Sequence, residues 1–301
     1  MRLQPSVLAL RFGTLMSFPF DLLAFDLDDT LLRPTHDLSL RTRGALIACH
    51  ERGARIVLAS GRMLPNMLPI AEQLPFPCSI VSFNGALVHE DWQADPIFHR
   101  PVPAPLATEV IDWAFARDLH LHFYTGNHLW TNRIDDWKAR VYREQTGAIL
   151  EFEPDFSRFR GQDATKLLIA DDPERIAELL QEGREHFGER LKLTRSRPIY
   201  LEFLHAQVDK GQGFRALCQH LGVPLERTAA FGDAYNDTEM LALAGQAVLM
   251  ENALPEVKEL GASQFNARIC ASNEEDGVAQ VLEEWLSQKS ENASQVEARH
   301  E

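Results

Sequence analysis

Residues 22–30 read LLAFDLDDT, a short apolar run that ends in three carboxylates and a threonine. A strand that is apolar throughout is buried on both faces, which is typical of a parallel sheet covered by helices. Four further runs have this texture: ARIVLAS from Ala54, CSIVSF from Cys78, TAAFGD from Thr228 and AVLM from Ala247. Helical patterns lie between them. The sequence therefore predicts an α/β fold with a doubly wound parallel sheet.

Two of the intervening helices have clear signals. Ser39 can cap a helix predicted over residues 40–52, and Gly53 supplies its stop. A second helix, predicted over residues 213–221, has apolar residues at i, i+3, i+4 and i+7. One stripe of this helix can therefore pack on a sheet.

The pattern changes between Val88 and about Leu204, where alternating, strand-like runs are interleaved with helices of their own. One such helix is predicted over residues 106–117, and another begins at Asp172-Pro173. Apolar strands of the first type resume only afterwards, so this segment is predicted to be an α+β domain inserted into the first. The predicted division is an N-terminal extension over residues 1–19, a first domain over residues 20–87 and 205–286, an inserted domain over residues 88–204, and a flexible C-terminal tail over residues 287–301. Met16 offers an alternative start to Met1.

The composition is that of an ordinary globular protein, with 45% hydrophobic and 25% charged residues among 301. The formal net charge of -14 would repel a phosphate backbone or an anionic membrane, so neither nucleic acid nor a membrane is expected as a partner. No apolar run approaches the roughly 18 residues of a membrane span. The cysteines form no CxxC pair and are expected to be buried free thiols in a reducing cytoplasm: Cys49, Cys78, Cys218 and Cys270.

Polar residues gather directly after the apolar strands. Asp26 and Asp28 follow the first strand, and the next three end in Ser60-Gly61, Asn84-Gly85 and Gly232-Asp233. The carboxyl ends of parallel strands meet at one edge of a sheet, where ligands bind. Carboxylates this close repel each other unless a divalent cation neutralises them, and oxygen ligands suit Mg²⁺. A phosphoryl group would complete its coordination, whereas a single acidic pair could also be a turn or a helix cap.

Five ordered motifs resemble those of the haloacid dehalogenase superfamily, in particular its Cof-type phosphatases of subclass IIB. They are DLDDTLL from Asp26, LASGR with Ser60, Asn84-Gly85, Asp209-Lys210-Gly211, and GDAYND from Gly232 to Asp237. The resemblance covers about residues 20–282. It implies a Rossmann-like core with an inserted α/β cap, and a Mg²⁺-dependent enzyme that removes a phosphoryl group from a small metabolite.

The same resemblance implies a role for each motif residue. Asp26 would be the nucleophile that becomes an aspartyl phosphate, and Asp28 the general acid and base. The phosphate oxygens would be held by Ser60, the backbone of Gly61, Lys210 and Asn236. Magnesium would be bound by Asp26, the backbone carbonyl of Asp28, and Asp233, with Asp237 a ligand or its neighbour. Taken singly, Asn236 or Asp237 could instead cap the helix through Ala244, and Lys210 could be solvated.

One residue departs from the family pattern. Asp29 stands where this branch usually has Gly. Aspartate tolerates a left-handed backbone better than most residues do, so the turn can survive. Activity is therefore expected to be retained.

Several alternatives remain open on the sequence alone. The substrate could be a sugar phosphate, pyridoxal phosphate or flavin mononucleotide, and the enzyme could instead be a phosphosugar mutase or a catalytically silent metabolite-binding protein. A dehalogenase is disfavoured because Asp28 is present. The GxGxxA pattern from Gly211 is weak evidence for a dinucleotide site, because six residues separate it from the preceding strand. His120 and His122 lack an evident third metal ligand and are expected at the surface or in the cap. The sequence carries no signal for the oligomeric state.

Overall fold

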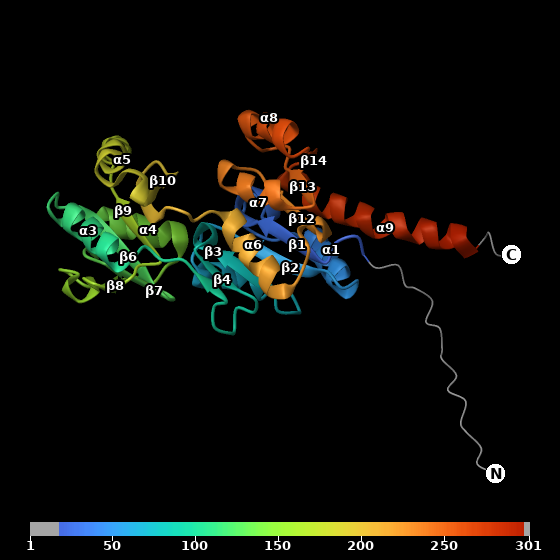
Figure 1. The fold of residues 1–301 in the computed structure, drawn as a ribbon, viewed down its shortest axis with the longest axis horizontal. Helices are drawn as coiled ribbons and strands as arrows, with labels where there is room; N and C mark the ends of the chain where they lie inside the picture. Colours follow the sequence, from blue (N-terminus) through green and yellow to red (C-terminus); the bar gives the residue numbers. More distant parts are fainter. Residues whose placement is uncertain (1–17, 298–301) are drawn as a thin grey trace, which may run out of the picture.

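The computed structural model describes residues 18–297, which form two lobes (Figure 1). The predicted start at Met16 and nearly all of the predicted N-terminal extension lie outside this range. Within it, no helix combines the length and the apolar character that crossing a membrane requires.

Over the described residues, the first lobe is built on an eight-stranded sheet in the order β14-β13-β12-β1-β2-β3-β4-β5. Its strands are β1 (Leu22–Asp26), β2 (Arg55–Ala59), β3 (Ser79–Ser82), β4 (Leu87–His89), β5 (Phe98–His99), β12 (Thr228–Gly232), β13 (Gln246–Leu249) and β14 (Arg268–Ile269). The strands from β14 to β3 are parallel, and β4 and β5 are antiparallel additions at one edge. β1 therefore lies in the middle of the parallel part.

Helices cover both faces of this sheet: α1 (Leu40–Glu51), α2 (Leu64–Ala71), α6 (Lys210–Leu221), α7 (Thr238–Leu243), α8 (Pro255–Gln264) and α9 (Gly277–Glu297). Leu23 and Phe25 of β1 pack with α1, α2 and α9. Leu22 and Ala24 point the other way and pack with α6, α7 and α8. Burial on both faces explains why these strands are apolar throughout. The predicted doubly wound α/β core is confirmed.

The second lobe is the inserted cap. In the part of the chain that is described, its sheet has six strands in the order β10-β11-β9-β6-β7-β8. The cap elements are α3 (Ala104–Phe115), β6 (His120–Thr125), β7 (His128–Thr131), α4 (Trp137–Thr146), β8 (Glu151–Phe152), β9 (Lys166–Ala170), α5 (Pro173–Phe187), β10 (Leu191–Arg197) and β11 (Tyr200–His205). One face of the sheet packs against α3 and α5. The other face packs against α4 and against Phe83 and Met63 of the core.

Single helical turns complete the chain at Leu27–Leu31, Phe83–Gly85, Ser157–Phe159, Gly188–Arg190, Leu225–Arg227, Tyr235–Asp237 and Asn273–Glu275. Three of these turns follow core strands. They are the turn after β1, the turn after β3 and the turn that begins three residues beyond β12, and they hold Asp28, Asn84, Asn236 and Asp237 of the polar residues that the sequence analysis singled out.

The predicted helix signals are present in the structure. The Ser39 hydroxyl accepts a hydrogen bond from the Thr42 backbone N–H (3.0 Å), and Gly53 ends α1 with a φ of +94°. α6 begins three residues before the predicted start at Gly213, because the Asp209 carboxylate caps it by accepting from the Gln212 N–H (2.7 Å). This cap places Lys210 in the first turn of the helix.

Two stretches differ from the sequence-based expectation. β5 and all of β4 except Leu87 fall within the segment assigned to the insert, yet β4 pairs with β3 and β5 pairs with β4, so both extend the core sheet. They are too short to carry a periodic signal of their own. At the other end, α9 continues to Glu297 through residues that were expected to be a flexible tail.

His120 and His122 lie in the cap but not at its surface, because both side chains are fully buried on β6. His120 is held by Asp136 (2.7 Å) and Thr131 (2.9 Å), and burial lowers the pKa of His122 well below its usual value. Both are therefore packing residues of the cap. The four cysteines are free and buried, as expected.

Candidate active site

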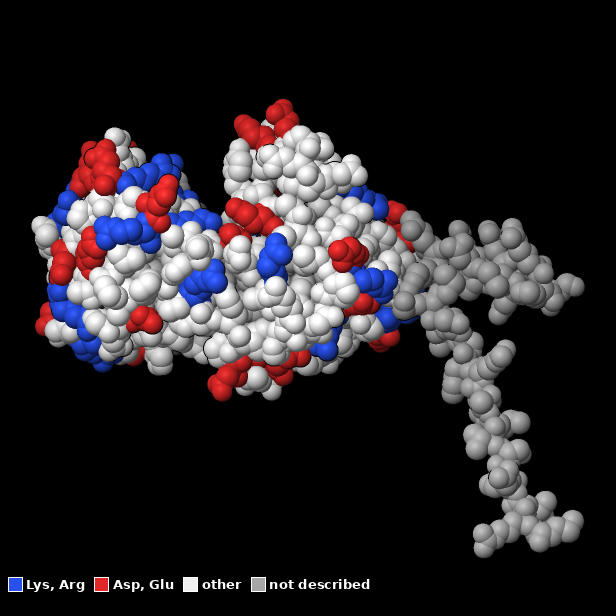
Figure 2. Space-filling model, viewed as in Figure 1, with Lys and Arg blue, Asp and Glu red and all other residues white. Residues whose placement is uncertain are grey.

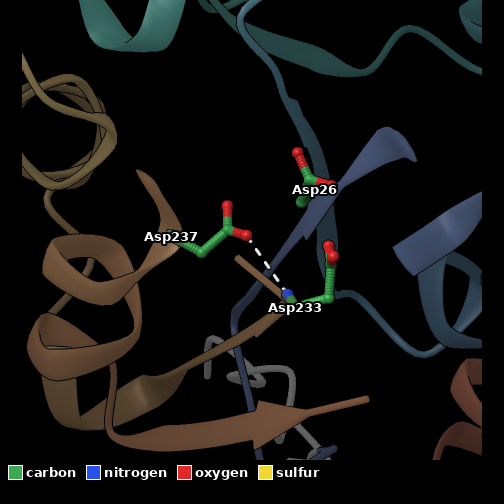
Figure 3. Close-up of side chains that lie close together, drawn as sticks. All are labelled: Asp26, Asp233 and Asp237. Atoms are coloured by element: carbon green, nitrogen blue, oxygen red, sulfur yellow. Dashed lines mark hydrogen bonds between the residues drawn. The ribbon is translucent and has the colours of Figure 1, made fainter. Parts of the chain in front are cut away.

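Three carboxylates meet at the carboxyl ends of β1 and β12. Asp26 ends β1, Asp233 directly follows β12, and Asp237 ends the turn that precedes α7. Figure 3 shows the three side chains converging from these separate segments. Each offers an oxygen atom within 4.8 Å of the others. They come together because β1 and β12 are parallel neighbours in register from Leu22 and Thr228 onward.

Lys210 is the positive charge of this cluster. Its side chain is fully buried, and its Nζ donates to Oδ1 of Asp237 (2.6 Å) and to Oδ1 of Asp26. Burial alone would lower the pKa of Lys210, but the charges of Asp237 and Asp26 outweigh it and raise that pKa. The lysine therefore stays protonated beside the carboxylates, and the reading of it as a solvated side chain is wrong.

Negative charge in this cluster is only partly neutralised. Burial raises the pKa of Asp26 well above its ordinary value, with Lys210 opposing the shift and Asp237 adding to it. Burial, reinforced by Asp237, raises the pKa of Asp233 to about 7. One ammonium thus faces three carboxylates, and a further cation would relieve the repulsion. A buried set of carboxylate oxygens suits a hard divalent ion such as Mg²⁺, so the residues present fit the metal that the sequence predicts.

The oxygens of Asp237 are already committed. Oδ1 accepts from Lys210, and Oδ2 accepts from the backbone N–H groups of Asp233 (3.1 Å) and Ala234 (3.0 Å). A Cβ on Gly232 would lie 2.6 Å from the Cβ of Asp237, so glycine is required for this close approach. Asp237 thereby fixes the backbone that carries Asp233, while Thr30 donates to Oδ1 of Asp233 (2.7 Å).

Asp28 stands outside the buried cluster, with 41% of its side chain exposed. The Arg62 guanidinium donates to both of its oxygens, from Nε at 2.9 Å. His36 brings Nδ1 to 3.4 Å from Oδ1 of the same carboxylate. Asp29, next along the chain, has a φ of +60° and thus adopts the left-handed backbone expected at the position of the usual glycine.

A second group of polar residues lies beside the carboxylates. Ser60 directly follows Ala59, the residue of β2 that pairs with Asp26 of β1. The Ser60 hydroxyl accepts a hydrogen bond from the Arg62 backbone N–H (3.2 Å). The backbone carbonyl of Ser60 accepts from the Asn84 N–H (3.0 Å). Asn84 in turn accepts from the side-chain amide of Asn236 (3.1 Å).

The predicted site residues thus occur in three adjoining places. Asp26, Lys210, Asp233 and Asp237 form one buried cluster. A second group gathers around Asn84, which contacts Ser60, Gly61 and Asn236. A Cβ on Gly61 would lie 3.1 Å from the side-chain nitrogen of Asn84. Asp28 lies with Arg62.

Sequence reasoning missed the contacts of Thr30, Arg62 and His36. Thr30 and Arg62 are themselves motif residues, in DLDDT and LASGR, so their presence could have suggested a role. No pattern pointed to His36, which reaches Asp28 from the loop that precedes α1.

The GxGxxA pattern has a packing explanation. A Cβ on Gly211 would lie 2.7 Å from the Glu239 carbonyl oxygen, and one on Gly213 would lie 2.8 Å from the Gly85 Cα. Both glycines let α6 approach α7 and the turn after β3. They lie within the helix rather than in a strand-to-helix loop, so a dinucleotide fingerprint is not formed.

The fold and this site define a capped α/β enzyme with the charged groups that phosphoryl transfer needs. A family model described as haloacid dehalogenase-like hydrolase matches residues 23–282. The chain belongs to this family.

Similar proteins agree with this assignment. An HMP-PP phosphatase of Serratia proteamaculans is 32% identical over 89% of this chain and 96% of its own length. The putative phosphatase YxeH of Bacillus subtilis is 29% identical over 90% of this chain and all of its own.

A crystal structure of a Thermotoga maritima protein superimposes with a TM-score of 0.81 at 30% identity, covering 88% of this chain and 97% of the other. A subclass IIB sugar phosphatase, at 21% identity and a TM-score of 0.71 over 88% of this chain and 98% of its own, supports the fold alone. The chain is therefore a phosphatase of the haloacid dehalogenase-like family.

Proposed function

We propose that this phosphatase is Mg²⁺-dependent and hydrolyses a phosphate monoester of a small metabolite through an aspartyl phosphate on Asp26. The observation that carries the proposal is the contact of buried Asp26 with Lys210, beside two further carboxylates within 4.8 Å. A carboxylate placed next to a permanent cation can attack phosphorus while the incoming negative charge is balanced.

Asp26, Asp233 and the backbone carbonyl of Asp28 would hold Mg²⁺, which supplies charge neutralisation at the transferring phosphoryl group. Asp237 is assigned to positioning rather than to direct ligation, because both of its oxygens already accept hydrogen bonds. Thr30 orients the carboxylate of Asp233 from the opposite side.

The remaining residues divide the chemistry. Asp26 forms a bond to phosphorus as the bond to the leaving oxygen breaks, and Asp28 donates its proton to that oxygen. Asp28 then takes a proton from water, which attacks the aspartyl phosphate and releases inorganic phosphate. Lys210, the Ser60 hydroxyl, the backbone N–H of Gly61 and the Asn236 amide hold the phosphate oxygens. Arg62 orients the Asp28 carboxylate, because the guanidinium group of Arg62 donates to both carboxylate oxygens.

We place the cap between His99 and His205 and assign to it the exclusion of water during transfer, with the core formed by the flanking segments. It touches the core where the Asn66 side chain of α2 donates to the carbonyl of Thr146 at the end of α4. Figure 2 shows the molecule hollowed between the lobes on one side. A cleft of about 510 Å³ is lined by residues of both lobes, among them Arg184 and Lys192 of the cap and Asp209 and Glu239 of the core.

The substrate is proposed to be a small phosphorylated metabolite, of the sugar phosphate, pyridoxal phosphate or flavin mononucleotide class. Because similar proteins are named HMP-PP phosphatase, HMP-PP should be included among the compounds tested first. Neither nucleic acid nor a membrane is proposed as a partner, because Figure 2 shows basic and acidic residues interspersed on the face it displays. The buried free thiols favour a cytoplasmic location.

The test is release of inorganic phosphate from a panel of these compounds with Mg²⁺, with a chelator, and in Asp26→Asn. We expect turnover that disappears with the chelator and in the variant. Undiminished turnover in Asp26→Asn would refute the covalent route. An isomerised product without free phosphate would identify a mutase instead, and no reaction with any compound would favour a binding protein.

A further inference from the structure

Three consecutive residues at the junction of core and cap have a left-handed backbone. Phe83, Asn84 and Gly85 follow β3 with φ values of +51°, +54° and +97°. Such a backbone is strained for phenylalanine, and it persists only where the surroundings hold it in place. Strained segments of this kind cluster at functional sites, and this one touches the proposed phosphoryl site through Asn84.

The backbone of this turn is anchored on the core side. The Phe83 N–H donates to the carbonyl of Arg62 (3.0 Å), and the Asn84 N–H donates to that of Ser60 (3.0 Å). A Cβ on Gly85 would lie 2.0 Å from the carbonyl oxygen of Asp209, so the turn is also pressed against the start of α6. Both segments that it contacts here, residues 60–62 and the start of α6, carry proposed site residues.

The side chain of Phe83 is held from the cap. Its ring is fully buried and meets the ring of Tyr124 edge-on, with centroids 5.7 Å apart. The ammonium of Lys166 lies 5.7 Å from the centroid of Phe83 and 4.8 Å from that of Tyr124. Lys166 is itself anchored by an ion pair with Glu202 on the next strand (2.9 Å). A buried ion pair adds little net stability. The pair of Lys166 with Glu202 is therefore better explained by the position in which it holds the Lys166 ammonium beside the two rings.

We propose that Phe83 is a positioning residue, through which contacts with the cap fix the geometry of the proposed phosphoryl-binding site. Held by Tyr124 and Lys166, its ring keeps the left-handed turn in place, and the turn directs the Asn84 side chain that orients the Asn236 amide. The proposal rests on the proposed function for the role of Asn236. It assigns to the cap an effect on catalysis besides the exclusion of water.

The test compares Phe83→Leu and Tyr124→Leu with Phe123→Leu as a matched control. Phe123 is the neighbour of Tyr124 on β6, is equally buried, and packs into the cap interior against Phe159 with centroids 4.5 Å apart. The control therefore loses an aromatic ring of the cap without touching Phe83.

We expect Phe83→Leu and Tyr124→Leu to lower kcat roughly tenfold to a hundredfold and to weaken competitive inhibition by inorganic phosphate, because displaced phosphate ligands act on the transition state. Phe123→Leu should keep both constants while losing comparable thermal stability. Equal constants for all three variants would overturn the proposal, as would wild-type constants in a folded Phe83→Leu.

A double-variant cycle asks whether Phe83 acts through Asn84. Asn84→Gly removes the amide and keeps a residue that tolerates the left-handed backbone. Phe83→Leu should change kcat little in the Asn84→Gly background, whereas additive effects would contradict the proposed route.

A readout that needs no turnover separates this inference from the proposed function. With asparagine labelled with ¹⁵N, the side-chain amide signal of Asn236 should move in Phe83→Leu and stay in place in Phe123→Leu. An unmoved signal would overturn the inference even if the enzyme is a phosphatase. A shifted signal in a protein without phosphatase activity would support the inference and count against the proposed function.

Discussion

Lys210→Met removes the positive charge that, among residues 18–297, contacts the carboxylate cluster, while keeping a side chain of similar length. The buried ammonium contacts Asp26 and Asp237, so the substitution leaves both carboxylates without their cation. Removing one partner of a buried ion pair typically costs about 3–5 kcal/mol of unfolding free energy. At roughly 2–4 °C per kcal/mol for a protein of this size class, the metal-free variant should melt about 6–20 °C lower than the wild type.

The loss should depend on pH and on magnesium. The raised pKa values of Asp26 and Asp233 mean that these carboxyls take up protons as the pH falls, which relieves the repulsion that Lys210 no longer balances. The melting difference should therefore be smaller at about pH 6 than at about pH 8. Added Mg²⁺ should recover part of the loss, because it binds only the folded state.

Thermal unfolding with and without Mg²⁺ measures these effects, and Lys258→Met is the control. Lys258 pairs with Glu251 at the surface (3.1 Å), where an ion pair contributes about 0–1 kcal/mol. The double variant Lys210→Met with Asp237→Asn should be more stable than Lys210→Met alone, since one uncompensated carboxylate is removed. A Lys210→Met protein as stable as the control variant would refute the reasoning, as would a loss that does not change between the two pH values.

Three further predictions follow from individual contacts. Since burial raises the pKa of Asp233 to about 7 and metal binding requires its ionised form, the Mg²⁺ affinity measured by calorimetry should rise as the pH increases through 7, and a flat profile would contradict the assignment of Asp233 as a ligand. Gly85→Ala should cost at least about 3 kcal/mol in urea unfolding, because the new Cβ would lie 2.0 Å from the Asp209 carbonyl oxygen at a φ of +97°. Gly53→Ala, with a φ of +94° and open space around it, should cost only about 1–2 kcal/mol, and equal costs would show that the contact with Asp209 does not matter. Thr30→Val removes the hydrogen bond to Asp233 and should weaken Mg²⁺ binding about tenfold, whereas unchanged binding would show that Thr30 does not orient the ligand.

The sequence predicted the core strands well because their burial on both faces leaves a continuous apolar signature. LLAFD, RIVLA and TAAFG appear as β1, β2 and β12, and parallel pairing brings the residues after them together. The buried contact of Lys210 with Asp26 could be expected only from the family resemblance. The two residues are far apart in sequence, and no local pattern records that they meet.

Other features were missed for physical reasons. β5 has two residues, too few for any periodicity, and its place in the core sheet depends on pairing with β4. His120 and His122 carry polar side chains, so burial was not expected. Their face of β6 is covered by α4, whose Tyr142 ring lies against the ring of His122, and no local sequence pattern records this contact.

The most direct measurement is to trap the phosphorylated enzyme during turnover and find the modified residue by mass spectrometry. With Mg²⁺ and a substrate that is turned over, rapid quenching should yield one phosphoryl group on the peptide that contains Asp26, and none in Asp26→Asn. Turnover with Asp26 unmodified, or the phosphoryl group on another residue, would contradict a nucleophilic role for this carboxylate.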